Sequence, residues 1–353
     1  MLFRKSINHL QSPIAHRSLS MSFLRFFPNL PILTLAPSRL IAAILSALAL
    51  SLSSATAVGK DYSASNKRQI ILDADTGNEV DDLFAVGRAL IEPSWQVTAL
   101  NATQWQNSLW TMPETMENSH RLNQMIAGHL DVKVHLRRGG VNRMFDWGDQ
   151  AQHSAAAYEI IKQAKSFNGP GKLTVIALGA LTNIGSALFI DPSIAGKLEV
   201  YWLGTEYDFD KGTMKTLDFN PMMDQQALHV VLNSAVDLHI IPVNVAGKLS
   251  FEYDRWYKRF HQVHPFTDFL LARWDQHLDS GRRRRTIWDL ALIQGMIHPT
   301  MTTKTTIRSS KEFGDRPIHY YRDINAEAMR ADFEKQLLSY LNVESKMSKA
   351  KTQ

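Results

Sequence analysis

The chain has 353 residues, of which 44% are hydrophobic, so it can bury the core of one large globular domain or of two smaller ones. Its formal net charge of +5 arises in residues 1–57, which hold five of the 39 Lys and Arg and no acidic residue; the other 34 basic residues balance 34 acidic ones. This neutral remainder gives no electrostatic reason to expect binding to nucleic acid. The absence of cysteine excludes disulfides, thiolate metal sites and a cysteine nucleophile.

The first 57 residues have the pattern of an export signal peptide. Arg39 precedes an apolar run at residues 40–50, and small residues then lead to Ala55-Thr56-Ala57, an A-x-A type of cleavage site. We expect cleavage there and export to the periplasm or out of the cell, with no membrane attachment afterwards. An uncleaved N-terminal membrane anchor is the alternative, because the apolar run approaches the length of a membrane span. Residues 58–67 form a polar linker.

An acidic loop follows the first strand-like run of the chain. Residues 70–72 are apolar and β-branched or leucine, Gly77 supplies a turn, and a helical pattern begins near residue 83. Five carboxylates lie between them, at Asp73, Asp75, Glu79, Asp81 and Asp82. So many like charges repel one another unless a cation or a bound polyol compensates them, which favours a hard-metal site with oxygen ligands. The alternative is a solvated loop whose last two aspartates favour the dipole of the next helix.

Short β-rich runs alternate with helical stretches along residues 70–243. This order predicts βαβ units and therefore an α/β fold, with an open, mixed but mostly parallel sheet covered by helices on both faces. Ligands bind such sheets beyond the carboxyl ends of the strands, where the acidic loop lies. The predicted strands are residues 70–72, 97–101, 132–136, 173–178, 198–203 and 238–243. The predicted helices are residues 83–90, 116–127, 155–165, 183–189 and 224–232.

Three later segments carry polar residues that favour a site. The strand at 173–178 runs into a tight turn in which Thr182 or Asn183 can cap the following helix. Asp218 and Asn220 are two residues apart and are expected on one side of an extended segment. Asp289 is a lone acid in an apolar helix and requires a partner when it is buried, for which a metal ion is a candidate.

The remainder of the chain is expected to complete a single domain over residues 68–345. Residues 250–278 are helical in pattern and rich in aromatics, and the four arginines at 282–285 are interpreted as a solvated charge run. Residues 305–307 and 318–321 resemble a hairpin, and residues 326–343 a closing helix. The expected disordered tail is residues 346–353.

Four of these motifs occur in one order: the acidic loop, the turn after residue 178, the Asp218-Phe219-Asn220 segment and the Trp288-Asp289 helix. Together they resemble the nucleoside hydrolase family (nucleoside N-ribohydrolases) across residues 68–345. The resemblance implies a Rossmann-like nucleoside hydrolase fold with one Ca²⁺ at the bottom of the pocket. The implied metal ligands are Asp75, Asp82, Asp289 and the main-chain carbonyl of Leu178.

The same resemblance implies hydrolysis of the N-glycosidic bond of a ribonucleoside to ribose and free base. Ca²⁺ accepts about six to eight oxygens, so the ribose diol and a water can complete its shell, with Asp75 as the general base on that metal-bound water. The implied sugar contacts are Asp81, Asn101, Asp218 and Asn220. Homodimers and homotetramers are common in the family, and the resemblance leaves both assemblies open for this chain.

The chain also departs from the family pattern. Residues 76–80 lengthen the acidic loop, Asp218 replaces the usual Glu, and Gly212 stands where the family often has Asn. Trp288 replaces the His of pyrimidine-tolerant members. Purine-preferring members carry Trp at this position, and an indole can stack on a purine, so we expect a purine-leaning substrate preference with Trp288 as a base contact. Core packing is the alternative role for Trp288.

These departures leave two other functions open. An exported relative could bind nucleosides or sugars without turnover, because Gly212, Asp218 and the acidic loop differ from the family pattern. Residues 70–75 also form a hydrophobic strand that ends in Asp-x-Asp, as in phosphatases of the haloacid dehalogenase type. That family requires Thr or Val where Gly77 stands, and it leaves Asp81 and Asp82 without a role, which makes it the less favoured hypothesis.

Overall fold

The computed structural model describes residues 67–107, 112–144, 150–276 and 282–351, and for residues 343–351 it describes only the backbone. The expected signal peptide at residues 1–57, and all of the linker at 58–67 except its last residue, lie outside these ranges. Across the described ranges, no helix combines the length and the apolar character needed to cross a membrane.

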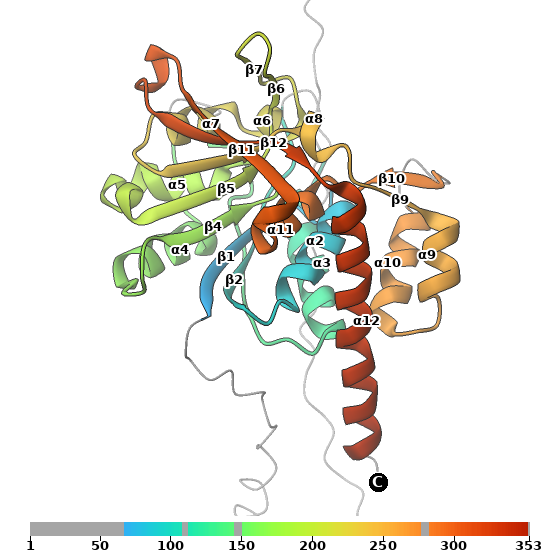
Figure 1. The fold of residues 1–353 in the computed structure, drawn as a ribbon. Coiled ribbons are helices and arrows are strands. Elements are labelled where there is room, and N and C mark those ends of the chain that lie inside the picture. The colour runs from blue at the N-terminus through green and yellow to red at the C-terminus, as the bar shows by residue number, and fades with distance from the viewer. Residues whose placement is uncertain (1–66, 108–111, 145–149, 277–281, 352–353) are drawn as a thin grey trace, which may run out of the picture. The chain divides into compact units, whose positions relative to one another are not determined.

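An eight-stranded sheet forms the centre of the described domain (Figure 1). Its strand order is β11-β12-β8-β5-β4-β1-β2-β3, and every neighbouring pair is parallel except β11 and β12. The predicted α/β class with a mixed, mostly parallel sheet is confirmed, and the predicted hairpin at residues 305–321 forms its antiparallel edge. The strands are β1 (Arg68–Ala74), β2 (Trp95–Ala102), β3 (His135–Arg137), β4 (Leu173–Ala177), β5 (Leu198–Leu203), β8 (Asp237–Ile241), β11 (Thr302–Arg308) and β12 (Pro317–Ile324).

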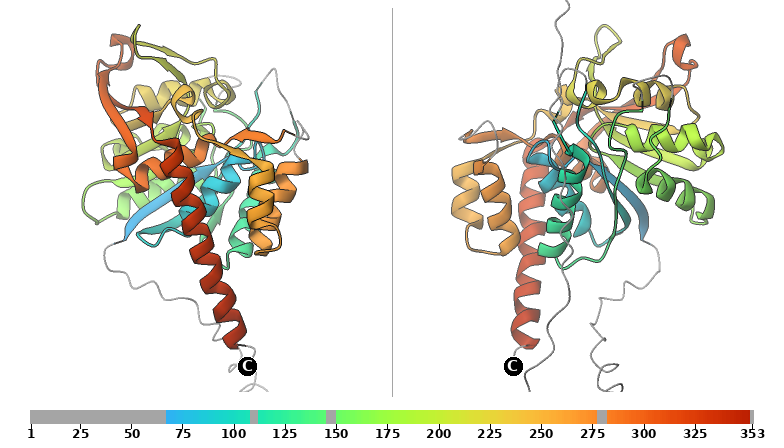
Figure 2. Two further views of the ribbon diagram at one scale, coloured as in Figure 1. Left: turned by 45° about the vertical axis from the view of Figure 1, so that its right-hand side comes forward. Right: turned by 180° about the vertical axis from the view of Figure 1, so that it is seen from behind.

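Helices cover both faces of the sheet because successive side chains of each strand point to opposite sides. In β1, Ile70 and Leu72 pack into one apolar cluster, and Ile71 packs into the other. The first cluster includes side chains of α2 (Asp81–Leu90), α3 (Thr115–His129), α11 (Trp288–Ile297) and α12 (Ala326–Lys351). The second includes side chains of α4 (Ala155–Ser166), α5 (Thr182–Ile190) and α7 (Gln225–Leu232). Figure 2 shows these layers from two further directions.

Two small two-stranded sheets and several short helices were not predicted. The sheets pair β6 (Glu206–Asp208) with β7 (Thr213–Lys215) and β9 (Ser250–Glu252) with β10 (Arg284–Thr286). Each of these strands has three residues, which is too short for an alternation pattern to stand out. The segment predicted as helical from residue 250 begins with β9 and continues as α9 (Tyr253–Phe260) and α10 (Pro265–Gln276). The short helices are α6 (Phe219–Met223) and α8 (Val243–Ala246).

Two strand boundaries differ from prediction for local reasons. The strand expected at 132–136 pairs only from His135, because the N–H of Val132 still donates to the Ala127 carbonyl (3.0 Å) and Asp131 has a positive φ of 49°. The strand expected at 238–243 ends at Ile241, since Pro242 has no N–H to donate to a neighbouring strand.

The disordered tail expected at residues 346–353 stays a prediction, and the structure describes a helical backbone over most of it. Helix α12 continues to Lys351, and residues 352–353 lie outside the described ranges. Residues 344–351 include Glu, Lys, Met and Ala, which are strong helix formers, so this composition favours the helical backbone described there.

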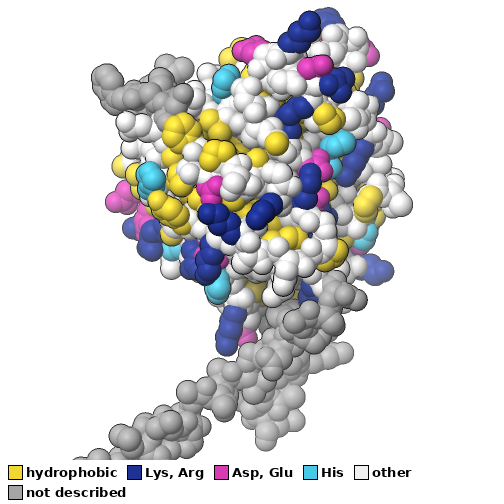
Figure 3. Space-filling model, turned by 90° about the vertical axis from the view of Figure 1, so that its left-hand side faces the viewer, with side chains coloured by type: hydrophobic (Ala, Val, Ile, Leu, Met, Phe, Trp, Pro, Cys, Tyr) yellow, Lys and Arg dark blue, Asp and Glu magenta, His cyan; other side chains and the backbone are white. Residues whose placement is uncertain are grey.

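Charged side chains are mixed on the face of the domain in Figure 3. Lys and Arg side chains lie scattered among acidic, histidine, apolar and uncharged ones. This distribution agrees with the balanced charge of the chain beyond residue 57. The described part of this face therefore offers no continuous basic surface to a polyanion.

Candidate active site

A cavity of about 380 Å³ opens beyond the carboxyl ends of β1, β4 and β5. This size suits a small organic molecule. The position is the one predicted for a ligand of a doubly wound parallel sheet. Its lining residues are Asp75, Asn78, Glu79, Asp81, Asp82, Leu178, Leu203, Glu206, Asp218, Phe219, Asn220, Val243, Asn244, Trp288 and Asp289.

Four aspartates reach the cavity from three separate segments. Asp75 follows the last residue of β1, Asp81 and Asp82 form the start of α2, and Asp289 lies in the first turn of α11. Helices α2 and α11 contribute to the same apolar cluster, so their N-termini deliver these residues to one place. The positive ends of the two helix dipoles partly compensate this negative charge.

The carboxyls are withdrawn from solvent, none being more than 5% exposed. Burial raises the pKa of Asp75 to about 8, and repulsion from Asp81 adds to the shift. Burial also raises the pKa of Asp81 to about 6, with repulsion from Glu79 as the next cause. Burial and the neighbouring aspartates hold the pKa values of Asp82 and Asp289 well above their ordinary range. In this state the group binds protons that a cation would displace.

Three carboxylate oxygens of this group accept no hydrogen bond: Oδ2 of Asp75, Oδ1 of Asp82 and Oδ1 of Asp289. Buried acceptors without a partner are rare and costly in proteins. An all-oxygen set of this kind matches the ligands that hard divalent cations such as Ca²⁺ and Mg²⁺ prefer. The residues present therefore fit a metal centre.

Asp81 lies closer to the candidate ligands than the sequence suggested. Asp81, Asp82 and Asp289 each offer a carboxylate oxygen within 4.8 Å of the others, and Oδ2 of Asp81 accepts the N–H of Asp289 at 3.4 Å. Asp75 is close enough to this group for repulsion from Asp81 to contribute to its raised pKa. The role inferred by resemblance for Asp81, a contact to the sugar, thus competes with a role as a metal ligand.

Leu178 and Asn220 meet directly. Nδ2 of Asn220 donates to the carbonyl of Leu178 (2.5 Å) and to the carbonyl of Leu203 (2.9 Å), so one amide ties the ends of β4 and β5. A carbonyl oxygen has two lone pairs and can accept this bond and still face a cation. Asn220 therefore also positions the predicted main-chain ligand.

The remaining predicted residues divide into two groups. Asp218 and Trp288 line the cavity as expected. Asp218 and Asn220, however, do not share an extended segment, because Asp218 is the residue before α6 and Asn220 lies within that helix. Pro221 favours this helical first turn. Asn101 is fully buried beside Asp73 in the register of β1 and β2 and is not among the residues that line the cavity. The structure gives no support to a direct sugar contact by Asn101.

A polar network surrounds Asp73, two residues before Asp75. Asp73 accepts hydrogen bonds from Thr103 (2.6 Å) and from Asn183 (3.0 Å), and burial raises its pKa to about 6. The Asn183 side chain therefore joins α5 to β1 and does not cap the helix. Thr182, the other expected cap, does not cap it either, because its hydroxyl donates to Asp224 (2.7 Å).

The turn after β4 also depends on a glycine that sequence analysis did not single out. A Cβ at Gly179 would meet Oδ1 of Asp75 at 2.5 Å. Only glycine therefore lets this turn approach the Asp75 carboxylate so closely.

Sequence analysis also missed an ion pair at the rim of the cavity. Nη1 of Arg285 lies 2.7 Å from Oε2 of Glu79, across 206 residues of chain. The Arg285 side chain is only 4% exposed, so the prediction of a solvated arginine run is wrong at this position. No local pattern signals such a pair, because it joins the acidic loop to β10, a strand that was not predicted.

The fold and the site together define an α/β protein with a carboxylate-lined cavity at the carboxyl ends of a parallel sheet. Residues 70–329 match the family described as inosine-uridine preferring nucleoside hydrolase. The chain belongs to this family.

Curated relatives resemble the chain over part of their length. A probable uridine nucleosidase 2 of Arabidopsis thaliana is 25% identical over 212 residues, which cover 54% of this chain and 63% of the relative. An inosine-uridine preferring nucleoside hydrolase of Leishmania major is 25% identical over 198 residues, covering 50% of this chain and 61% of the relative. The chain thus spans about three fifths of the length of these relatives.

Solved structures share the fold more completely. A plant nucleoside hydrolase superposes with a TM-score of 0.59 at 18% identity, covering 77% of this chain and 99% of the plant protein. A purine-preferring ribonucleoside hydrolase from Gardnerella vaginalis gives a TM-score of 0.57 at 17% identity, covering 78% of this chain and all of the other. At these identities the similarity establishes the fold alone.

Proposed function

We propose that this protein is a Ca²⁺-dependent hydrolase that cleaves the N-glycosidic bond of ribonucleosides, with a preference for purines. The observation that carries the proposal is the convergence of buried, unpaired oxygens of Asp75, Asp82 and Asp289 at one cavity. Membership of the nucleoside hydrolase family supports the reaction class. The choice of Ca²⁺ rests on an all-oxygen donor set with several carboxylates.

The cation would be held by Asp82, Asp289, Asp75 and the Leu178 carbonyl, with Asp81 as a further candidate. When bound, it supplies Lewis acidity that fixes a ribose diol and makes a water easier to deprotonate. The raised pKa values of these carboxyls follow from burial and mutual repulsion, so positive charge at this point lets them ionise at neutral pH.

Hydrolysis then requires a proton acceptor, side chains that bind the sugar, and departure of the base. Asp75 accepts a proton from the attacking water, whose oxygen bonds to C1′ of the ribose. The electron pair of the broken C1′–N bond leaves with the base, which takes up a proton. Asp218 and Asn220, on the same cavity wall, hold the sugar hydroxyls while positive charge develops on the ring.

The purine preference depends on Trp288. This side chain lines the cavity directly before Asp289 and packs against the apolar cluster, so both roles considered from the sequence apply to it. An indole face offers a larger stacking surface to a purine than to a pyrimidine. The relatives include uridine nucleosidases and a purine-preferring enzyme, so base preference has to be measured.

Release of free base from inosine, adenosine and uridine, with Ca²⁺ and with a chelator, tests the proposal. We expect turnover that is lost with the chelator, restored by Ca²⁺ and faster for the two purine nucleosides. Turnover that survives complete metal removal would contradict the metal dependence, and faster cleavage of uridine would contradict the purine preference.

The same assay separates the other two hypotheses. Calorimetric binding of a nucleoside without base release would favour a non-catalytic exported binding protein. Phosphate release from an aryl phosphate with Mg²⁺ would favour the haloacid dehalogenase-like reaction. Membership of the nucleoside hydrolase family argues against that last reaction.

Export of the protein is also part of the proposal. The support is the signal-like pattern of residues 1–57 alone. The intact mass of the protein recovered outside the cytoplasm is expected to correspond to a chain that begins at Val58. A full-length chain retained in the membrane would favour the anchor.

A further inference from the structure

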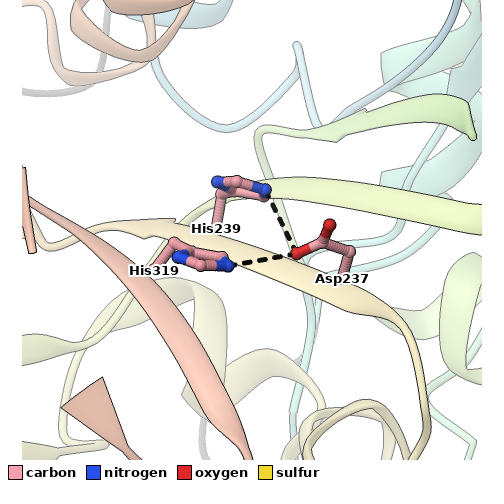
Figure 4. A group of neighbouring side chains, drawn as sticks. All are labelled: Asp237, His239 and His319. Carbon is pink, nitrogen blue, oxygen red and sulfur yellow. Dashed lines mark ion pairs between the residues drawn. The ribbon is translucent and has the colours of Figure 1, made fainter. Parts of the chain in front are cut away.

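A second group of ligand-type side chains lies away from the catalytic cavity. Asp237 is the first residue of β8, His239 is two residues further along the same strand, and His319 lies on β12 (Figure 4). None of the three lines the cavity, which opens beyond the opposite ends of the parallel strands. The proposed hydrolysis uses none of these residues.

The strand register explains why the three side chains meet. Residues two apart on a strand share a face, so Asp237 and His239 point to the same side of the sheet. His319 is the register partner of His239 in the parallel pairing of β12 with β8. The two imidazole rings are stacked, with centroids 4.6 Å apart, and the ring of Tyr201 stacks on the other side of His239 at 4.2 Å. The rings are therefore held in place by their neighbours.

The distances within the group suit a shared ion better than hydrogen bonds. Nε2 of His239 and Nε2 of His319 each lie 3.4 Å from the same oxygen, Oδ1 of Asp237 (Figure 4). A good N–H···O bond measures about 2.7–3.2 Å. Two ligands of a tetrahedral Zn²⁺, each bound at about 2.0–2.2 Å, lie about 3.3–3.6 Å apart. All three ligand atoms lie within 4.8 Å of one another.

We propose that Asp237, His239 and His319 form a binding site for a borderline divalent transition metal ion of the Zn²⁺ class. The ligand atoms are Oδ1 of Asp237 and Nε2 of each histidine. Two imidazoles and one carboxylate select Zn²⁺, Ni²⁺ or Cu²⁺ over Ca²⁺ and Mg²⁺, which prefer oxygen alone. The chain would thus carry two metal sites of different hardness.

The surroundings support this ligand assignment. Nδ1 of His319 lies 2.8 Å from the hydroxyl oxygen of Thr306 on β11. In the tautomer with the proton on Nδ1, His319 donates to Thr306 and keeps the lone pair of Nε2 for the ion. Nζ of Lys172 lies 3.4 Å from Oδ2 of Asp237, the oxygen that does not face the histidines. The histidine side chains are 14% and 33% exposed, so an ion can reach them.

Such an ion would tie β12, and with it the antiparallel edge of the sheet, to β8. The ion would be attracted by one carboxylate and repelled by two nearby lysines, Lys172 and Lys304. The ammonium group of Lys304 lies over the rings of Tyr201 and Tyr321. These lysines weaken the binding of any cation, so we expect micromolar affinity and not the tight binding of a site made of several anionic ligands.

The test uses the full chain freed of metal and then saturated with Ca²⁺, so that the acidic cavity is filled before Zn²⁺ is titrated calorimetrically. We expect one Zn²⁺ per chain, a rise in Tm on binding, and a loss of affinity of roughly tenfold or more in His319→Gln and Asp237→Asn. His135→Ala, an exposed histidine of β3, serves as the matched control and is expected to bind Zn²⁺ like the unchanged protein.

Electron paramagnetic resonance of bound Cu²⁺ provides a second measurement. It distinguishes the two sites because the acidic site offers only oxygen ligands and gives no nitrogen hyperfine coupling. Nitrogen hyperfine coupling is expected in the unchanged protein and is expected to weaken in His319→Gln. Circular dichroism of the variants before metal is added shows whether they fold. No Zn²⁺ binding in the Ca²⁺-saturated protein, or equal binding by folded His319→Gln, would overturn the proposal and leave the three residues as an ion-pair cluster.

Discussion

At the scale of single residues, the proposed mechanism depends first on Asp75. Its carboxyl lies in the cavity beside Asp82, Oδ2 has no hydrogen-bond partner, and Gly179 leaves room for it. Asp75→Asn preserves the volume but removes the proton acceptor, so we expect kcat to fall by roughly 10²–10⁴-fold. Steady-state kinetics on inosine measure this, with the exposed Asp315→Asn as a control. A variant that keeps more than a tenth of kcat would exclude Asp75 as the base.

Substitution of Asp81 distinguishes its two candidate roles, metal ligand and sugar contact. As a metal ligand, Asp81→Asn would weaken Ca²⁺ binding; as a sugar contact, it would raise KM at saturating Ca²⁺ and leave Ca²⁺ affinity unchanged. Because its carboxylate lies with those of Asp82 and Asp289, we expect weaker Ca²⁺ binding. Calorimetric titration of Ca²⁺ into the metal-free variant, beside Asp289→Asn as a positive control, distinguishes the two.

At the scale of elements, the site depends on two helix N-termini and on β10, whose Arg285 contacts the acidic loop. Helices α2 and α11 bring Asp82 and Asp289 together, and β10 brings Arg285 to Glu79. Each contact joins segments about 200 residues apart in the chain. The site therefore exists only when these elements are packed.

A double-mutant cycle on Glu79→Gln and Arg285→Met measures the coupling between the acidic loop and β10. Arg285 is almost fully buried in this pair, so we expect a coupling free energy of roughly 0.5–3 kcal/mol in urea unfolding. The exposed pair of Arg308 and Asp315 is the control, with an expected coupling below about 1 kcal/mol. Equal coupling in the two cycles would show that the rim pair is an ordinary surface contact.

At the scale of the whole molecule, the carboxylate cluster makes stability depend on pH and metal. The pKa values of Asp75, at about 8, and Asp81, at about 6, exceed the value of about 4 in an unfolded chain. Without metal the folded protein therefore holds protons that the unfolded chain has lost. Its free energy of unfolding is expected to fall as the pH rises from about 4 to about 8.

Urea unfolding of the metal-free protein between pH 5 and pH 8 measures this slope. Ca²⁺ is expected to flatten the slope and to raise stability most at pH 8, because the ionised carboxylates then face a cation. Asp289→Asn is expected to reduce the slope without metal, since it removes one repelling carboxyl. Equal stability of the metal-free protein at pH 5 and pH 8 would show that these groups do not titrate as described.

Local sequence patterns predicted the segments that carry the three main aspartates of the site. The apolar run before Asp75, the helical pattern after Asp82 and the apolar helix around Asp289 are visible in the sequence, because each depends on contacts only a few residues apart. Their order along the chain was sufficient to predict the parallel sheet and to indicate the family resemblance. Prediction was weakest where the signal was short, as in β6, β7, β9 and β10, or where tertiary hydrogen bonds replaced a local cap, as at Thr182 and Asn183.

The sequence by itself determined the α/β class and the position of the acidic loop at a strand end, since strand and helix periodicity are local properties. The candidate metal ligands were implied by the resemblance of its motifs to those of nucleoside hydrolases. Only the tertiary structure decided that Asp81 lies beside Asp82 and Asp289, that Asn101 is buried and does not line the cavity, that Arg285 is buried and that two histidines and an aspartate share a sheet face. These features depend on strand register and helix packing, which are fixed when distant segments bury their apolar faces together.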